Sequence, residues 1–470
     1  MRLTSPKKTF QNNEVRGDGF FVPAHPTVHQ GDRNLFKALL EARRDFLGIW
    51  NDQDFRCGIR SVRLLGRQIV GINSPEAIKH VLVTRHDNYE RKSPQMRRAL
   101  EFLLGDGLFI SDGETWRNRR PLVADIVHKN RLPSFGPVME RVAAETATRW
   151  AGIGKAEIVD IQVEMAALTA EIISRSVFGN DLAAGEAETL AGGFHSYQKL
   201  VDPVNLGYFL GFNEGLPILR GPRLSRAVRR VHGVINRVLA SHLGGQSNSP
   251  SMIELLVRRQ AKSPDLKLDV TALRNEAATI FMAGYETTAS VLTWTWYLLA
   301  NAPWAEAGVH AEIAAICGER SPTIEDVPKL DYCRSVIEEA MRLYPPVPIL
   351  GRQAKAEDHV EGVKIGASAL ILVMPWLLHR SPDLWEKPNH FMPERFLRAE
   401  RPAPFTYIPF AVGQRMCPGL NFGLSEAILC LATLARRFRV RLVPGHPVEP
   451  QSRLTLRPRH GLLARIEPRS

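Results

Sequence analysis

One cysteine segment near residue 417 limits what this chain can fold into more than any other feature. It reads Phe410-Ala-Val-Gly-Gln-Arg-Met-Cys417-Pro-Gly419 and directly precedes an apolar run. Gly413 and Gly419 permit a tight turn in which backbone N–H groups approach a sulfur. Pro418 suits the first position of a helix. Because a helix N-terminus carries partial positive charge, we expect it to stabilise a thiolate and to lower the Cys417 pKa.

A shielded thiolate in such a loop is what a haem iron requires as its axial ligand, since electron release from sulfur favours O–O cleavage. Phe410 would keep water from the sulfur. A buried structural cysteine before a helix would explain Cys417, but not Gly413, Arg415 and Gly419. The segment resembles the cysteine-ligand loop of the cytochrome P450 family. The resemblance implies haem b (iron protoporphyrin IX) bound through Cys417, with Phe410 and Gly419 as further cofactor-binding residues.

A second group of polar residues interrupts the longest apolar helical stretch, from Thr271 to Ala300. A buried acid and threonines in a helix are costly without a task or a partner, although a kink with a satisfied polar pair would also explain them. The stretch Met282-Ala-Gly-Tyr-Glu286-Thr287-Thr288 resembles the oxygen-binding helix of the same family. By that resemblance, Ala283 and Gly284 leave room for dioxygen, Thr287 hydrogen-bonds the activated oxygen and holds a water, and Glu286 supplies protons.

Two further segments resemble structural elements of the family. Glu339-Ala-Met-Arg342 places acid and base on one helix face, a pair that alone would usually be solvated and weak. Downstream, Pro393-Glu-Arg395-Phe resembles the family's Pro-Glu-Arg-Phe element. The resemblance implies that Glu339, Arg342 and Arg395 form a buried charge network behind the haem, with a structural and not a chemical role.

Trp116 and Arg120 are one helical turn apart and can share a face, and both are donors to carboxylates. The resemblance assigns them to a haem propionate, together with Arg352 and Arg415; each arginine would otherwise be a solvated surface charge. Arg117 and Arg119 should then point to solvent, where they could help to dock an acidic electron donor. Candidate substrate-pocket residues, by analogy with the family, are apolar: Phe109, Phe209, Val347, Ile349, Leu350 and Leu454.

Composition limits the remaining possibilities. The chain has 470 residues, 44% of them apolar. Its five cysteines include no Cys-x-x-Cys pair. This pattern argues against disulfides, structural zinc and iron–sulfur ligation, and it favours a reducing compartment, the cytoplasm. The net charge is +12, but basic residues are scattered, so nucleic-acid binding is not expected. No signal peptide or membrane anchor is expected either. The uncharged stretch 287–305 approaches spanning length, yet its threonines favour a core helix.

We therefore expect a mainly α fold with a small β-rich region, in which the haem lies between the long central helix and the cysteine loop. Residues 1–33 are predicted to be an irregular leader and residues 34–470 one haem-thiolate monooxygenase domain, closest in its motifs to the long-chain, fatty-acid-hydroxylase branch. It would hydroxylate a lipophilic small molecule with O2 and two electrons that come from NAD(P)H through a separate ferredoxin or flavodoxin. A haem-thiolate isomerase or dehydratase that does not use O2, and a non-catalytic haem sensor, are the alternatives.

Overall fold

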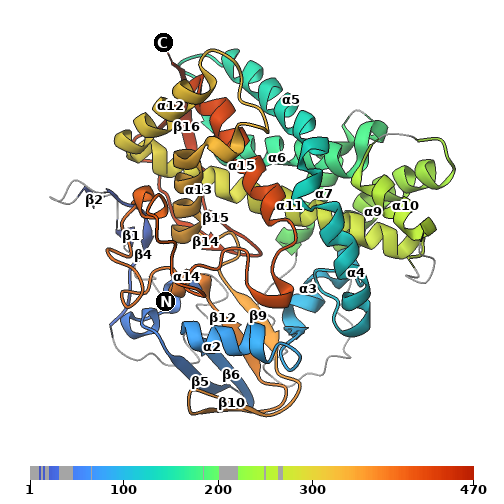
Figure 1. Cartoon of the computed structure of the whole chain (residues 1–470), viewed down its shortest axis with the longest axis vertical. Coiled ribbons are helices and arrows are strands. Elements are labelled where there is room, and N and C mark those ends of the chain that lie inside the picture. Colours follow the sequence, from blue (N-terminus) through green and yellow to red (C-terminus); the bar gives the residue numbers. More distant parts are fainter. Residues whose placement is uncertain are drawn as a thin grey trace, which may run out of the picture.

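The computed structural model describes residues 10–11, 14–15, 21–30, 46–64, 66–183, 185–200, 221–247, 250–262 and 268–469. In Figure 1 the strands β5, β6, β9, β10 and β12 gather at one end of the molecule, while helices dominate the remainder, with shorter strands such as β14, β15 and β16 among them. The described helices are α2 (Pro75–Lys79), α3 (Pro94–Leu104), α4 (Gly113–Ile126), α5 (Leu132–Ala151), α6 (Ile161–Phe178), α7 (Glu186–Leu200), α9 (Pro222–Leu243), α10 (Met252–Lys262), α11 (Val270–Asn301), α12 (Pro303–Cys317), α13 (Asp331–Leu343), α14 (Pro375–Leu378) and α15 (Leu420–Ala435).

The strands are short. They are β1 (Phe10–Gln11), β2 (Glu14–Val15), β3 (Phe21–Val22), β4 (His25–Pro26), β5 (Ile59–Leu64), β6 (Arg67–Ile72), β7 (Arg91–Lys92), β8 (Val159–Asp160), β9 (Leu350–Gln353), β10 (Asp358–Val360), β11 (Val363–Ile365), β12 (Leu370–Val373), β13 (Phe438–Leu442), β14 (Pro450–Ser452), β15 (Leu456–Pro458) and β16 (Leu463–Pro468). The largest sheet has the order β5-β6-β12-β9-β7, with β12 parallel to β6 and antiparallel to β9. In this sheet β7 brings Lys92 directly opposite Arg352 of β9.

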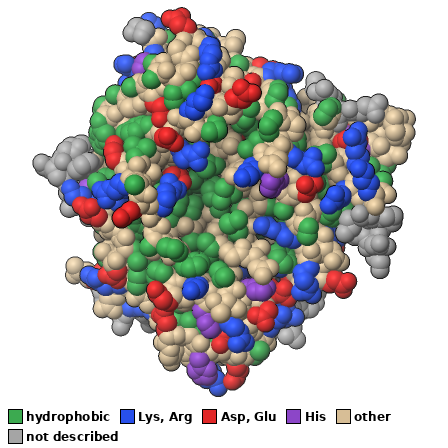
Figure 2. Space-filling view, in the orientation of Figure 1, with side chains coloured by type: hydrophobic (Ala, Val, Ile, Leu, Met, Phe, Trp, Pro, Cys, Tyr) green, Lys and Arg blue, Asp and Glu red, His purple; other side chains and the backbone are tan. Residues whose placement is uncertain are grey.

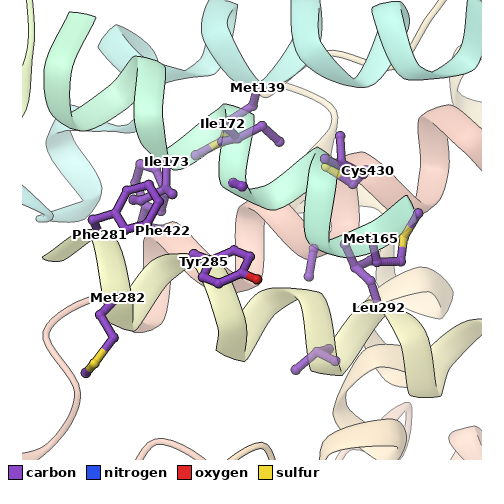
Figure 3. Close-up of a cluster of buried hydrophobic side chains, with 14 of the residues drawn as sticks. Met139, Met165, Ile172, Ile173, Phe281, Met282, Tyr285, Leu292, Phe422 and Cys430 are labelled. Atoms are coloured by element: carbon purple, nitrogen blue, oxygen red, sulfur yellow. The ribbon is translucent and has the colours of Figure 1, made fainter. Parts of the chain in front are cut away.

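Helix α11 is the spine of the fold. Asp269 caps its first turn by accepting a hydrogen bond from the backbone N–H of Ala272, and Pro303 begins the next helix directly after it. Helix α6 packs along α11 at close range, because a Cβ on Gly284 would lie 2.7 Å from Ile173 Cδ1. Figure 3 shows the core between these helices and α5 and α15, with Met139, Ile173, Phe281 and Phe422 pointing into it. The long helix is thus fixed on several sides.

Local sequence explains several of the elements. The strands β5 and β6 flank the turn at Gly66, and Ser74 caps helix α2 by accepting a hydrogen bond from the backbone N–H of Ala77. Helices α5 and α6 follow each other along the chain, with the short strand β8 between them. The predicted leader contributes two antiparallel pairs, β1 with β4 and β2 with β3. Within the described residues, no helix combines the length and apolarity needed to cross a bilayer.

Candidate functional site

The cysteine loop closes through backbone hydrogen bonds. Cys417 N–H donates to the Phe410 carbonyl at 2.9 Å, and Met416 N–H donates to Gly413 O at 3.0 Å. Gly413 has φ +74°, and a Cβ there would lie 2.0 Å from the carbonyl oxygen of Leu82. Only glycine fits such a conformation and such a close approach. The loop is therefore locked against the turn of helix His80–Thr84.

The surroundings of the Cys417 sulfur differ in two respects from the sequence expectation. Helix α15 begins at Leu420 with Gly419 as its N-cap, so Pro418 precedes the cap and is not the first helical residue. The pKa of Cys417 is raised and not lowered, because desolvation by the surrounding protein outweighs the Gly419 N–H bond to the sulfur and the charges of Arg120 and Lys92. The predicted approach of a backbone N–H to the sulfur is present, and it comes from Gly419.

Four cationic side chains lie around this loop. Arg120 and Lys92 act electrostatically on the Cys417 sulfur, and Arg352 and Arg415 act on Lys92. Arg352 is 2% exposed, and among the described residues its guanidinium has one hydrogen bond, to the carbonyl of Gly351. Desolvation lowers the pKa of Arg352 to about 10 and that of Arg415 to about 10. None of the four forms a salt bridge with a carboxylate of the described residues.

Arg415 joins this cluster to the tryptophan predicted beside it. Its guanidinium lies over the ring of Trp116, 4.4 Å from the ring centre, and its Nη1 donates to the Ser111 carbonyl at 2.8 Å. Its Nε and Nη2 are buried and find no acceptor among the residues that the structure describes. Buried donors of this kind call for an acidic ligand, so the donor set fits a group that carries carboxylates next to the sulfur.

Sequence reasoning missed Lys92. It lies in the two-residue strand β7, opposite Arg352, and its ammonium group lies 4.7 Å from the centre of the Phe109 ring. Like charges on directly opposed strand positions destabilise a sheet, and burial lowers the Lys92 pKa well below its usual value. The signal in the sequence was too weak to find it, because the pairing of β7 with a strand about 260 residues later exists only in the fold.

The predicted charge network is present in full. Glu339 and Arg342 are both completely buried. Arg342 donates to both carboxylate oxygens of Glu339 at 2.7 and 2.8 Å, and Arg395 Nε donates to the same carboxylate at 3.2 Å. The remaining Arg342 donors reach the backbone carbonyls of His379, Pro388 and His390.

His379 extends this network toward the cysteine loop, and sequence reasoning missed it. The ring is fully buried and its Nε2 accepts a hydrogen bond from the backbone N–H of Ile408 at 2.9 Å. Burial lowers the His379 pKa to about 3, so the ring is neutral at physiological pH. Because its backbone carbonyl binds Arg342, His379 connects the charge network to the segment that leads into Phe410.

The polar residues of α11 occupy separate environments. Thr287 Oγ1 donates to the Ala283 carbonyl at 2.6 Å, whereas Glu286 accepts hydrogen bonds from Thr455 and Gln198. Desolvation raises the pKa of Glu286. Ala283 is exposed, whereas Gly284 lies against Ile173 of α6, and this close packing by itself accounts for the glycine. The roles predicted for these residues in oxygen activation remain predictions.

One expectation for helix α4 is wrong. Arg117 is exposed, as predicted, but Arg119 is buried and donates to the carboxylate and backbone carbonyl of Asp106 and to Glu276 of α11. Glu276 also accepts from the backbone N–H of Leu108 at 3.0 Å. Arg119 therefore holds the loop between α3 and α4 to the long helix and does not face a partner. Helical spacing indicated that Arg119 neighbours Arg120 on the helix, but it could not show that Glu276 of α11 lies within hydrogen-bond distance of Arg119.

The predicted substrate-pocket residues that the structure describes are half-buried. Phe109, Ile349 and Leu454 pack against the main core, and Leu350 packs against the cluster around the large sheet. Val347 is also half-buried. Phe209 lies outside the described residues. Half-burial is compatible both with lining a pocket and with packing the core at each of these positions.

The whole arrangement can now be compared with known proteins. The family model for cytochrome P450 matches residues 55–465. The chain belongs to the cytochrome P450 family. It is accordingly a P450 monooxygenase that uses haem and dioxygen.

Similar proteins cover most of this P450. Cyclooctatin synthase of Streptomyces melanosporofaciens is 32% identical, over 81% of this chain and 83% of that protein. Cyclooctat-9-en-7-ol 5-monooxygenase of the same organism is 31% identical, over 73% and 74%. The putative cytochrome P450 132 of Mycobacterium tuberculosis is 27% identical, over 90% and 92%. The crystal structure of the cytochrome P450DA heme domain has the same fold, with a TM-score of 0.76 at 22% identity over 88% of this chain and 90% of that one.

Proposed function

We propose that this P450 inserts one oxygen atom of O2 into a lipophilic small molecule, with two electrons delivered by a separate ferredoxin or flavodoxin that is reduced at the expense of NAD(P)H. The overall reaction is RH + O2 + 2e− + 2H+ → ROH + H2O. The observation that carries the proposal is the Cys417 sulfur, held by a hydrogen-bonded loop beside a cluster of four cations that form no salt bridge with a carboxylate in the described part of the chain.

In this proposal the sulfur of Cys417 would bind the haem iron, and Arg120, Arg352, Arg415 and Lys92 would hold the haem propionates, with Trp116 beside them. Bound in this way, the haem supplies the electron-rich iron centre at which O2 is reductively activated. Phe410 packs beside the loop and limits the access of water to the sulfur. Thr287 would position a proton donor at the site, and Glu286, whose pKa desolvation raises, would supply protons to it.

The substrate class follows from the apolar residues proposed to line the pocket and from the relatives. Pockets of this kind bind lipophilic groups and use few polar contacts. Two relatives are named for cyclooctatin and for cyclooctat-9-en-7-ol. A terpenoid therefore heads the proposed substrates, before fatty acids and aromatic compounds.

The central test replaces the sulfur ligand. The Cys417→Ala variant should lose the red-shifted Soret band of the ferrous carbon monoxide complex and all turnover, whereas Cys57→Ala, at a half-buried cysteine beside Ser381, should retain both. Persistence of that band in Cys417→Ala would remove Cys417 from the site. A screen for Soret shifts with farnesol, palmitic acid and progesterone would then identify the substrate class; tight shifts only with multiply charged metabolites would contradict a lipophilic pocket.

Electron delivery can be tested at Arg117, which is exposed on α4 and lies 3.5 Å from Glu90. We propose that it forms part of the basic surface that an acidic donor approaches. Arg117→Glu should slow reduction by a ferredoxin at low salt, and high salt should reduce the difference. Substrate-induced Soret shifts should not change. Equal reduction rates at low salt would place the docking surface elsewhere.

A further inference from the structure

Glu286 is held by two residues from distant parts of the chain. Thr455 Oγ1 donates to Oε1 of Glu286 at 2.7 Å, and Gln198 Nε2 donates to Oε2. Thr455 lies in the turn between β14 and β15, and Gln198 lies near the C-terminal end of α7. Meanwhile the hydroxyl of Thr287 is directed to its own helix backbone. Acid and alcohol, although adjacent in sequence, therefore have separate partners.

The turn that carries Thr455 is docked rigidly on α11. Ser290 Oγ and Trp294 Nε1 both donate to the carbonyl of Leu456, the latter at 3.0 Å. With Glu286 they are spaced four residues apart, so the three side chains follow one another along one face of the helix. The backbone N–H of Leu456 donates to Pro346 O at 3.0 Å. Leu456 is thus held at both its N–H and its carbonyl.

The residue before Thr455 is Leu454, a candidate pocket residue that is half-buried against the core. Leu454 is therefore the sequence neighbour of a residue that is bonded to Glu286. Gln198 bonds the same carboxyl from α7. The carboxyl of Glu286 is consequently clamped between two elements.

We propose that Thr455 and Gln198 are positioning residues that hold the Glu286 carboxyl at one place beside the long helix, from which it supplies protons during turnover. This inference rests on the proposed role of Glu286 in proton supply. Holding the carboxyl in place would keep its protons available when oxygen is activated, so that electrons form product and not peroxide.

The groups around Glu286 determine the direction in which its pKa should change when one of them is removed. Desolvation raises its pKa, while the bonds from Thr455 and Gln198 and the nearby Arg457 of β15 lower it. Tyr285 of α11 faces the carboxyl as well and stays neutral, with its own pKa raised to about 12 by burial. His195 of α7 senses Arg457, and burial lowers its pKa. Loss of the Thr455 hydroxyl should therefore raise the Glu286 pKa further.

The first experiment needs no substrate. The carboxyl band of Glu286 is assigned in infrared difference spectra of the holoenzyme as the band that Glu286→Gln removes, and it is titrated with pH. Thr455→Val, which keeps the shape but loses the hydroxyl, should raise the titration midpoint by about one pH unit. Thr455→Ser, which keeps the hydroxyl, should leave it unchanged. An unchanged midpoint in Thr455→Val would overturn the proposal.

The second experiment measures coupling, as product formed per NAD(P)H consumed, with farnesol, palmitic acid or progesterone. Thr455→Val and Gln198→Leu should lower coupling roughly tenfold with more peroxide released, while the Soret titration and haem content stay as in the wild type. The double variant Thr455→Val/Glu286→Gln should be no worse than Glu286→Gln alone. Wild-type coupling in Glu286→Gln would defeat the proposed function itself; low coupling there with wild-type coupling in Thr455→Val defeats only the clamp.

Discussion

Two groups of buried arginines in this P450 have opposite surroundings. Behind the cysteine loop, Arg342 donates to Glu339 and to three backbone carbonyls, and none of its nitrogen atoms lacks an acceptor. Beside the loop, Arg415 keeps two buried nitrogen atoms without an acceptor, and Arg352 has one bond to a backbone carbonyl. In the first group Arg342 completes its bonds within the described chain, so its role is structural, although Arg395 there keeps one buried nitrogen atom, Nη2, without an acceptor. The second leaves donors for a ligand, so its role is binding.

The structural role of the first group is tested most directly at Arg342. Arg342→Gln removes one member of a buried ion pair and leaves Glu339 without its main partner, which should cost about 3–5 kcal/mol. We expect low soluble yield and a much lower melting temperature. Arg401→Gln is the control, because Arg401 pairs with Glu338 at 2.5 Å but its side chain is 54% exposed, and exposed pairs contribute about 0–1 kcal/mol. Similar melting temperatures for the two variants would show that burial of the network does not matter.

Arg352→Gln should have the opposite effect, with stability retained and haem binding weakened. The protein should remain soluble, since no carboxylate in the described chain loses a partner, but it should lose haem faster. One charge-assisted bond contributes about 1.5–3 kcal/mol, or roughly 10- to 100-fold in retention. The rate of haem transfer to apomyoglobin measures this, with exposed Arg117→Gln as control. Insoluble protein with tightly bound haem would reverse the assignment of the two groups.

The buried pair of Arg119 and Glu276 should make the stability of the protein depend on pH. Burial raises the pKa of Glu276 from 4.5 to about 7 despite Arg119. Between these values the folded protein retains a proton that the unfolded chain releases. Stability should therefore fall as pH rises through this window, by at most about 1.4 kcal/mol per pH unit. Melting temperatures from pH 5 to 7 should decline less in Glu276→Gln than in the wild type. Parallel curves for the two proteins would show that Glu276 stays ionised.

The smallest effect is expected at Lys92. Lys92→Met removes one of four cations but also relieves the like-charge contact with Arg352 across β7 and β9. The two consequences oppose each other, so haem loss should accelerate only about two- to fivefold. Arg91→Met on the same strand, with its side chain 55% exposed, should not change the rate. If Lys92→Met lost haem as fast as Arg352→Gln, Lys92 would contribute as much to haem retention as Arg352 does.

What could be predicted from sequence depended on how local the information was. The cysteine loop, the Glu339 and Arg342 pair and the long helix are each set by residues within one short segment, and all three are found. Arg119, Lys92 and His379 each depend on at least one partner more than 25 residues away (Glu276, Arg352 and Ile408, respectively), which spacing along the chain cannot reveal. The direction of the Cys417 pKa was wrong for a related reason. Desolvation comes from everything packed around the sulfur, whereas the local motif shows only the stabilising helix end.

The docking of Leu456 has a practical consequence for changing what this enzyme accepts. Because its carbonyl is fixed by Ser290 and Trp294 and its N–H by Pro346, an insertion or deletion in the β14–β15 turn would disturb the helix that carries Glu286. A library for altered selectivity should therefore vary the side chain at Leu454 while it preserves the length of the turn and the hydroxyl at Thr455. The site is best redesigned by exchanging one side chain on a fixed frame.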